Sequence, residues 1–537
     1  MGRTRTALAS LVYGGCFAVS ITCASALATI CASALATAAQ GGAAGSGNAA
    51  AAAAAKAREY HRANQHKIVN ELREWLSIPN VAADTANIQR AGERLKQMLE
   101  QRGVRARLLP IAGRGPVVYG ELPAPGAKRT VIFYCHYDGQ PVDASRWIDT
   151  KPFEPALRTA AIHAGGKLIP FPEAGTPYQD DWRIYARSAS DDKSPIIALL
   201  TALDILRANK IPLAFNLKFA FDGEEEDGSP NLEKTLLAHK ELFAADLLIS
   251  ADGPVHQTGL PELVFGNRGV MDVEITVYGP YRALHSGHYG NWAPNPAMRL
   301  AELLATMKEE EGRVLIAGFY DDVVPLTALE KSAIADAPKN EPELMREFGF
   351  AQADGGGKSL LELIHQPSLN VRGLRSAYVG GEARTIVPDS AIASLDLRLV
   401  KNIDPKTHFE KVVAHIRKQG FYVTDREPTA EERAKYPRIA RVEMGGGYRA
   451  ARMQMDHLAA QALVRVSKAA IPGPWVMLPT SGGSVPMYIF ENLGLPVAHV
   501  PIVNHDNNQH SENENLRLGN FWRGIELFTA IFAGLTW

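Results

Sequence analysis

The chain has 537 residues, which is too long for one compact domain and predicts two or three units, each with its own core. Hydrophobic residues make up 46% and charged residues 21% of the chain, proportions that are typical of folded proteins and exclude a disordered one. The 57 Lys and Arg residues nearly balance the 58 Asp and Glu residues, so the charge gives no reason to expect nucleic acid as a partner and favours small molecules.

The N-terminal residues are expected to lie outside the folded body. Arg3 and Arg5 precede an apolar, alanine-rich run that ends in small residues at 36–38, a pattern typical of a secretory signal peptide. Residues 1–38 are therefore predicted to be a signal peptide, and the protein to be exported, either periplasmic or secreted. A retained membrane anchor is the weaker alternative, because Ser, Thr and Gly interrupt the apolar run; no stable membrane insertion is expected after removal of the signal.

The next segment, residues 39–55, consists almost entirely of Ala and Gly and is predicted to be a mobile linker. Cleavage before it would leave Cys135 as the remaining cysteine, so no internal disulfide is expected even in an oxidising compartment. The folded part is expected to begin near Lys56.

Helices and short β-rich runs alternate over residues 56–267, the first predicted part of a catalytic domain. Helices are predicted at residues 66–80, 87–102, 195–209 and 230–243. β-rich runs are predicted at residues 130–135, 215–221 and 246–250. The alternation predicts an α/β fold with a mostly parallel sheet flanked by helices, and such sheets place active sites at the carboxyl ends of their strands.

A different pattern begins near Gly269. Residues 270–279 and 390–400 alternate strictly between apolar and polar, and helices are predicted at 295–307 and 405–420. These features predict a smaller α+β domain over residues 268–449 that is inserted into the first. Residues 450–537, in which the parallel-sheet pattern resumes, are predicted to complete the catalytic domain.

Polar side chains follow the predicted strands. His136 and Asp138 come directly after the run at 130–135 and lie on the same side of an extended segment, where a carboxylate can orient a metal-binding imidazole. Glu225 and Glu226 follow the next strand, and Asp252 follows the one after it. Hydrolysis at a metal needs one carboxylate that binds the metal and another that carries a proton, although adjacent glutamates can equally form a solvated acidic turn.

Seven strings occur in the order seen in one family of enzymes. They are HYDGQPVD, SASDDKSP, DGEEEDGSP, SADGP, ALHSGHYG, SGGSVPM and QHSENE. From about residue 60 to the carboxyl end, the chain resembles the co-catalytic di-zinc metallopeptidase family of carnosinase-type dipeptidases. That family also includes aminoacylases, folate-cleaving carboxypeptidases and succinyl-diaminopimelate desuccinylase.

The resemblance implies two Zn2+ ions per subunit, with Mn2+ or Co2+ as substitutes. By motif, His136 and Asp252 resemble the terminal ligands of one ion, Glu226 and His510 those of the other, and Asp191 the ligand that bridges both. Glu225 is implied as the general base, because Glu225 to Ser229 fit the Glu-Glu-x-Gly-Ser pattern in only one register, and Asp138 is implied to assist beside His136. A cis peptide bond is implied between Asp191 and Asp192.

The resemblance also assigns roles to the inserted lid and dimerisation domain. His285 resembles a histidine that reaches the active site of a neighbouring subunit and steadies the oxyanion, so a homodimer is expected. Implied ligands of the substrate carboxylate are Arg398, Ser481, Gly482, Gly483 and Ser484. Two departures from the family pattern stand out: Ala186-Arg187-Ser188 replaces Gly-Arg-Gly, and the loop at 158–183 is long, which affects substrate scope.

The expected reaction is zinc-dependent hydrolysis of the amide bond of dipeptides or short peptides next to a free carboxyl terminus, by Glu-assisted attack of a zinc-bridging hydroxide. Two alternatives stay open. One is an N-acyl amino acid amidohydrolase of the aminoacylase kind, which the same metal site would serve. The other is a peptide-binding protein that has lost catalysis.

Overall fold

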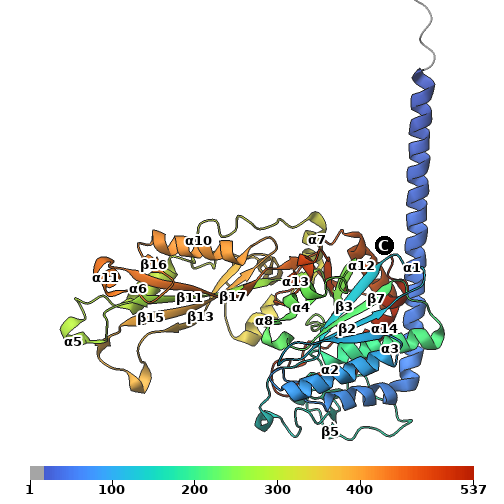
Figure 1. Cartoon of the computed structure of the whole chain (residues 1–537), viewed down its shortest axis with the longest axis horizontal. Coiled ribbons are helices and arrows are strands. Elements are labelled where there is room, and N and C mark those ends of the chain that lie inside the picture. The colour runs from blue at the N-terminus through green and yellow to red at the C-terminus, as the bar shows by residue number, and fades with distance from the viewer. Residues whose placement is uncertain (1–16) are drawn as a thin grey trace, which may run out of the picture.

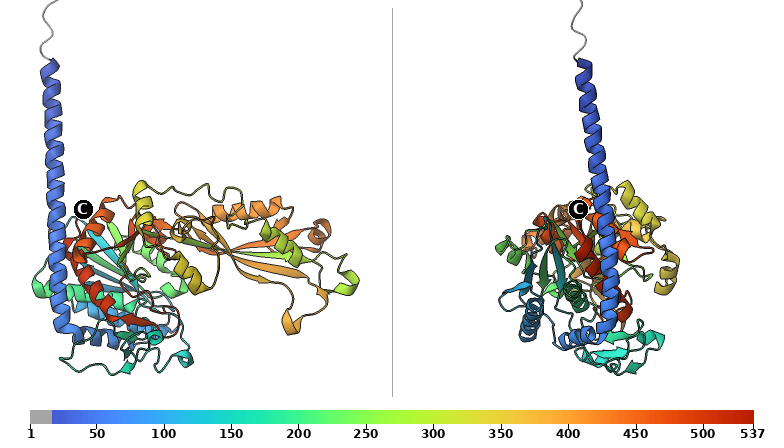
Figure 2. Two further views of the ribbon diagram at one scale, coloured as in Figure 1. Left: turned by 180° about the vertical axis from the view of Figure 1, so that it is seen from behind. Right: turned by 90° about the vertical axis from the view of Figure 1, so that its right-hand side faces the viewer.

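The computed structural model describes residues 17–537, with side chains from residue 45 onward. Figure 1 shows an α/β body and a second, elongated domain that projects from it. Helix α1 (Phe17–Leu76) stands on the side of the body opposite the second domain, and its N-terminal part extends beyond the body (Figure 2). The predicted α/β fold with an inserted α+β domain is confirmed.

The predicted mobile linker is wrong, because residues 39–55 are part of α1. Alanine has the highest intrinsic helix propensity, so an alanine-rich run is helical where packing supports it. That support is present, since Ala50, Ala54 and Ala57 are buried in the main core. A Cβ atom added to Gly534 of α14 (Leu518–Gly534) would lie 2.9 Å from Ala50 Cβ, so glycine permits the close approach of the two helices.

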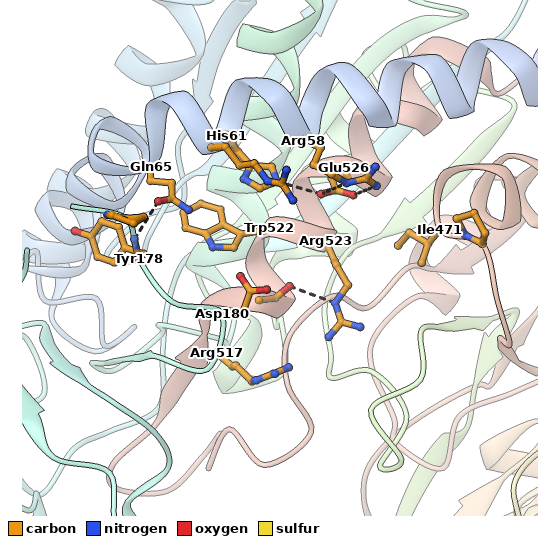
Figure 3. A pocket seen from close by; sticks show the side chains of 14 residues that line it. Arg58, His61, Gln65, Tyr178, Asp180, Ile471, Arg517, Trp522, Arg523 and Glu526 are labelled. Carbon is orange, nitrogen blue, oxygen red and sulfur yellow. Dashed lines mark hydrogen bonds and ion pairs between the residues drawn. The ribbon is translucent and has the colours of Figure 1, made fainter. Parts of the chain in front are cut away.

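Polar contacts also hold α1 against α14, and they line a cavity of about 620 Å³ (Figure 3). Arg58 Nη2 and His61 Nε2 lie 2.6 Å and 3.0 Å from the two carboxylate oxygens of Glu526. The ring of His61 stacks on that of Trp522, with 5.3 Å between centroids. Among the described residues, no group of potential metal ligands lies in this cavity. The contacts of Arg58 and His61 with Glu526 and Trp522 dock α1 on the body.

The body is built on an eight-stranded sheet with the order β1-β2-β7-β3-β8-β20-β9-β19. Its central strands, which run parallel, are β7 (Asn216–Asp222), β3 (Thr130–His136), β8 (Leu247–Ser250) and β20 (Val497–His499). The outer strands are β1 (Arg105–Leu109), β2 (Val117–Leu122), β9 (Glu262–Val264) and β19 (Val476–Leu478). Because β9 runs antiparallel to β20, its first residue lies at the edge where the central strands end.

Helices cover both faces of this sheet. One face packs against α1, α2 (Thr85–Glu100), α3 (Lys193–Asn209), α12 (Leu458–Ala470) and α14, with Phe133 of β3 in the shared core. The other face packs against α4 (Leu232–Ala238) and α13 (Tyr488–Asn492), with Tyr134 in that core. Helix α4 is shorter than the helix predicted at 230–243, because it begins at Leu232 and ends at Ala238.

The long segment predicted as a loop at 158–183 contains strands of a second, four-stranded sheet. That sheet has the order β21-β6-β4-β5, formed by Asn515–Arg517, Arg183–Tyr185, Ala156–Arg158 and Leu168–Ile169. Pairing of β21 with β6 ties the chain just after His510 to the chain just before Asp191.

The inserted domain has a five-stranded sheet with the order β13-β15-β11-β17-β16, formed by Ser368–Arg375, Ser390–Leu399, Gly269–Tyr278, Ile439–Tyr448 and Tyr422–Thr424. Helices α6 (Pro296–Ala305) and α10 (Pro405–Lys418) share its core, to which Leu300 and Ile416 belong. The two chain crossings between the domains pair with each other as β10 (Gly266–Asn267) and β18 (Ala451–Arg452). None of the described helices is both long and apolar enough to cross a membrane.

Candidate active site

Side chains with metal-binding or acid–base chemistry gather at the carboxyl ends of the parallel strands. His136 is the last residue of β3, and Glu225 and Glu226 lie in a short turn after β7. Asp252 follows β8, and Asp191 comes just before α3. Since neighbouring strands are about 4.8 Å apart, consecutive strand ends place these groups within reach of common ligands.

Asp191 lies between two histidines. Its Oδ1 is 2.8 Å from His136 Nε2, and its Oδ2 is 3.1 Å from His510 Nε2, which is also 3.2 Å from Glu226 Oε2. Two groups of potential ligand atoms, each within 4.8 Å, form here: His136 with Asp191 and Glu226, and His136 with Asp192 and Asp252. The structure therefore brings the five predicted ligands together. It adds buried Asp192, which the sequence did not single out, and the bond between Asp191 and Asp192 is cis, as expected.

The protonation of this cluster reflects burial first and crowding of like charges second. Burial, followed by the negative charge of Asp191, raises the pKa of Glu226 to about 7 and that of Asp252 to about 6. Although burial opposes it, hydrogen bonding with His136 and His510 holds the pKa of Asp191 below its usual value. Divalent cations between these carboxylates would relieve the repulsion. A donor set of carboxylate oxygens and imidazole nitrogens suits zinc, manganese or cobalt, so the residues fit a divalent metal site.

Asp138 organises the residues around it. Its carboxylate accepts hydrogen bonds from the backbone N–H groups of Glu225 at 3.1 Å and Glu226 at 3.0 Å. Its Oδ1 is 3.4 Å from Nδ1 of His136, the nitrogen opposite the one that faces Asp191. Asp138 thus fixes one imidazole and the turn that carries both glutamates.

Asp138→Asn is expected to weaken metal binding by about 10-fold to 100-fold, because an amide NH2 group would replace one oxygen that accepts a backbone hydrogen bond. Metal affinity, measured by competition with a coloured chelator, tests this. Asp143→Asn is the matched control, since Asp143 is exposed and caps a short helical turn. An Asp138→Asn variant with unchanged affinity would contradict the role of Asp138.

Glu514 holds the loop that carries Asp191, a role that sequence reasoning missed. One carboxylate oxygen accepts from the N–H groups of Ser190 at 2.9 Å and Asp191 at 3.0 Å. The other accepts from the N–H of Ser188 and from Arg187 Nη1, both at 2.9 Å. Glu514 has no exposed surface. It lies within the string QHSENE, where sequence alone cannot distinguish it from a solvated acidic residue.

The departure from Gly-Arg-Gly is accommodated at Ser188. This residue has a φ of 62°, in the left-handed region that favours glycine. Its hydroxyl accepts a hydrogen bond from Asn80 Nδ2 at 2.9 Å. That hydrogen bond helps offset the strain of a non-glycine residue at this position.

A cavity of about 500 Å³ opens over the cluster. Predicted site residues that line it are Asp191, Glu225, Glu226, Asp252, His510, Ser481, Gly483 and Ser484. Gly482 is not among the lining residues. Arg398 of β15 contacts the same loop, because its Nη1 donates a hydrogen bond to Ser484 Oγ at 2.8 Å. His285 is exposed and lies next to α5 (Ser286–Tyr289), at the far end of the inserted domain (Figure 1). It is therefore absent from the cavity of its own chain.

Comparison with known proteins places the chain among metallopeptidases. The family model described as "Peptidase family M20/M25/M40" matches residues 132–533. The human Beta-Ala-His dipeptidase is 26% identical over 508 residues, with 89% of this chain and 92% of the relative covered. The Cys-Gly metallodipeptidase dug1 of Schizosaccharomyces pombe is 28% identical over 422 residues, with 77% and 81% covered.

Solved structures with a similar fold include members of the same peptidase family. The M20 family metallo-carboxypeptidase Sso-CP2 from Sulfolobus solfataricus has a TM-score of 0.70 and 30% identity, with 87% of this chain and 98% of that chain covered. Human carnosine dipeptidase 1, at 23% identity and a TM-score of 0.67, shares the fold over 90% of this chain and 98% of its own.

The predicted export to the periplasm or the exterior is wrong by these comparisons. The matched relatives include fungal Cys-Gly metallodipeptidases and mammalian Beta-Ala-His dipeptidases, none of which is named as a periplasmic protein. Moreover, α1 continues through the predicted cleavage region at 36–38 into residues that pack on the body. Residues 1–16 of the predicted signal lie outside the described part of the chain.

Proposed function

Because the chain belongs to peptidase family M20/M25/M40 and is a metallopeptidase, we propose that it hydrolyses the amide bond of dipeptides or short peptides next to a free carboxyl terminus. The observation that carries this proposal is the gathering of five candidate ligands, four of which line one cavity together with the partly buried Glu225. The dipeptidase names of the relatives, which match over most of their own length, support the substrate class.

In this proposal His136 and Asp252 would hold one Zn2+ ion and Glu226 and His510 the second, with Asp191 as a ligand shared between the two groups. Mn2+ and Co2+ suit the same donors. When bound, the two ions supply Lewis-acid polarisation of the scissile carbonyl and acidify the attacking water. The role of Asp138 is to hold the imidazole of His136 and the turn of Glu225 and Glu226.

Glu225 is proposed as the proton carrier. It takes a proton from the water molecule whose oxygen bonds to the carbonyl carbon, and it gives that proton to the nitrogen as the C–N bond breaks. The products are a carboxylic acid and a free amine. Burial raises the pKa of Glu225 well above its ordinary value, as expected for a carboxyl group that returns a proton to a leaving amine.

The terminal carboxylate of the substrate is proposed to bind at Arg398 and the Ser481–Ser484 loop. Arg398 Nη1 already donates to Ser484 Oγ, and its Nε lies 3.4 Å from Asp396 Oδ1, so the guanidinium is held in place at the loop. A guanidinium offers paired donors that match a carboxylate. Ser484 and Gly483 supply a hydroxyl and main-chain groups on the cavity side.

His285 is proposed to act on the site of a partner subunit in a homodimer. Large apolar residues close to it in the chain are exposed, with Tyr281 at 66% and Trp292 at 81% exposure, as expected for an interface between copies. His285→Ala is expected to lower kcat about 100-fold to 1,000-fold without loss of metal, because one oxyanion donor is removed. Activity and metal content of the purified variant test this, with His288→Ala as the control.

A mixing experiment separates action across subunits from action within one. Mixed dimers of His285→Ala and Glu225→Gln chains contain one site with an intact Glu225 and an intact partner histidine. Activity should therefore return on mixing two nearly inactive proteins. Absence of any recovery in verified mixed dimers would contradict the proposal.

Substrate class is tested with a panel of dipeptides and matching N-acetyl amino acids, using the full chain loaded with zinc. Release of free amine from dipeptides at least 10 times faster than from N-acetyl amino acids supports a dipeptidase. The reverse preference would replace it with the amidohydrolase alternative.

A further inference from the structure

Glu262 lines the same cavity but belongs to none of the groups described above. It is the first residue of β9, at the sheet edge where the parallel strands end, and it is only 8% exposed. No hydrogen bond or ion pair joins its carboxylate to any residue in the described part of the chain. A buried carboxylate without a partner costs free energy, so its presence beside a binding cavity calls for an explanation.

The neighbouring His499 does not supply the missing charge. It is the last residue of β20, lines the same cavity and is 7% exposed. Its Nε2 is buried and has no hydrogen-bond partner among the described residues. Burial lowers the pKa of His499 to about 4, so its imidazole is neutral at neutral pH. This end of the cavity therefore offers one unpaired carboxyl group and a neutral ring nitrogen, and no cationic side chain of the described residues pairs with either.

The sheet order separates Glu262 from the metal ligands. Strand β20 lies between β8, which Asp252 follows, and β9, which Glu262 begins. Two strand spacings place the main chains of Asp252 and Glu262 roughly 10 Å apart. In agreement with this separation, burial alone raises the pKa of Glu262 to about 8, so the carboxyl group is largely protonated at neutral pH and ionises when a cation binds beside it. The scissile carbonyl is proposed to lie at the metal ligands, so an amino group next to it would not reach Glu262. The charge on a lysine or arginine side chain extends roughly 6 Å from its Cα atom and can therefore span most of the distance.

We propose that Glu262, with His499 beside it, forms a specificity pocket for a lysine or arginine side chain on the residue at the amino side of the scissile bond. This inference rests on the proposed peptidase function. The carboxylate-binding loop and Arg398 take the other end of the substrate, so the two charged ends of the cavity select a short peptide with a basic first residue. The cation of the substrate supplies the partner that the carboxylate lacks.

The test compares Lys-Gly with Met-Gly, whose side chain is similar in length and neutral, on wild-type protein and Glu262→Gln. Wild-type kcat/KM is expected to be about 10-fold to 100-fold higher for Lys-Gly, the range for one charge-assisted contact. Glu262→Gln should remove this preference and leave Met-Gly within twofold. Glu347→Gln, an exposed glutamate on α8 (Glu341–Phe348), is the control and should change neither.

A second measurement needs no variant. Acetylation of the lysine Nε in Lys-Gly removes the charge and keeps the stem, and it should lower kcat/KM to the level of Met-Gly. Equal rates for all three peptides would overturn the inference and leave the peptidase proposal intact. Equal loss on Lys-Gly and Met-Gly in Glu262→Gln would also overturn it, since it would indicate a structural role. Failure of wild-type protein to cleave any peptide would overturn both proposals.

Discussion

Glu225→Gln is expected to keep both metal ions and to lose activity by about 100-fold to 10,000-fold. Glutamine has the size of glutamate but cannot take a proton from water. Because Glu225 and Glu226 are adjacent in one turn, the backbone hydrogen bonds to Asp138 should persist in the variant. Steady-state kinetics on a dipeptide, together with metal content per chain, measure both parts of this prediction.

Two comparisons make the prediction specific. Glu226→Gln should lose metal as well as activity, since Glu226 faces His510 in the ligand cluster. Glu241→Gln, at an exposed position, should change neither. A Glu225→Gln protein that is metal-loaded and active would remove the assignment of Glu225 as the proton carrier, and one that has lost its metal would make Glu225 a ligand.

Glu514→Gln is expected to lower the free energy of unfolding by about 3 to 5 kcal/mol, the range for breaking a buried ion pair. Arg187 is 2% exposed and would keep its charge without a counter-ion. An NH2 group would also replace an oxygen that accepts backbone N–H groups, so the loop of Asp191 should shift and metal content should fall. Chemical denaturation and metal analysis of the purified variant test this.

A double-mutant cycle identifies the cause. Arg187→Met combined with Glu514→Gln should cost less than the sum of the two single changes, because no unpaired charge remains. Simple additivity would show that the ion pair is not the source of the effect. A Glu514→Gln protein with wild-type stability would contradict the role of Glu514 altogether.

Much of the fold and of the ligand cluster could be predicted because the signals are local. The apolar strands that become β3, β7 and β8 end in His136, in the turn of Glu225, and just before Asp252, and a parallel sheet brings such ends together. The cis bond between Asp191 and Asp192 followed from the family resemblance.

The rest depends on tertiary contacts that no local pattern contains. Glu514 differs from an ordinary surface glutamate only because β21 pairs with β6 and buries it. Glu262 is buried by the antiparallel placement of β9 beside β20. Residues 39–55 resemble a flexible tether in composition, but packing of Ala50 and Ala54 against the body makes them helical. The role proposed for His285 requires a second copy of the chain, so no local pattern in one chain can place it.

We propose that a metal cluster held by five side chains makes this chain a peptidase, the ligands being His136, Asp191, Glu226, Asp252 and His510. The rate of dipeptide hydrolysis, followed through removal of metal by a chelator and return of Zn2+, tests it most directly. The rate is predicted to fall to background on chelation and to recover with zinc. Hydrolysis that persists without metal, or a zinc-loaded protein that binds dipeptides and leaves them intact, would contradict the claim.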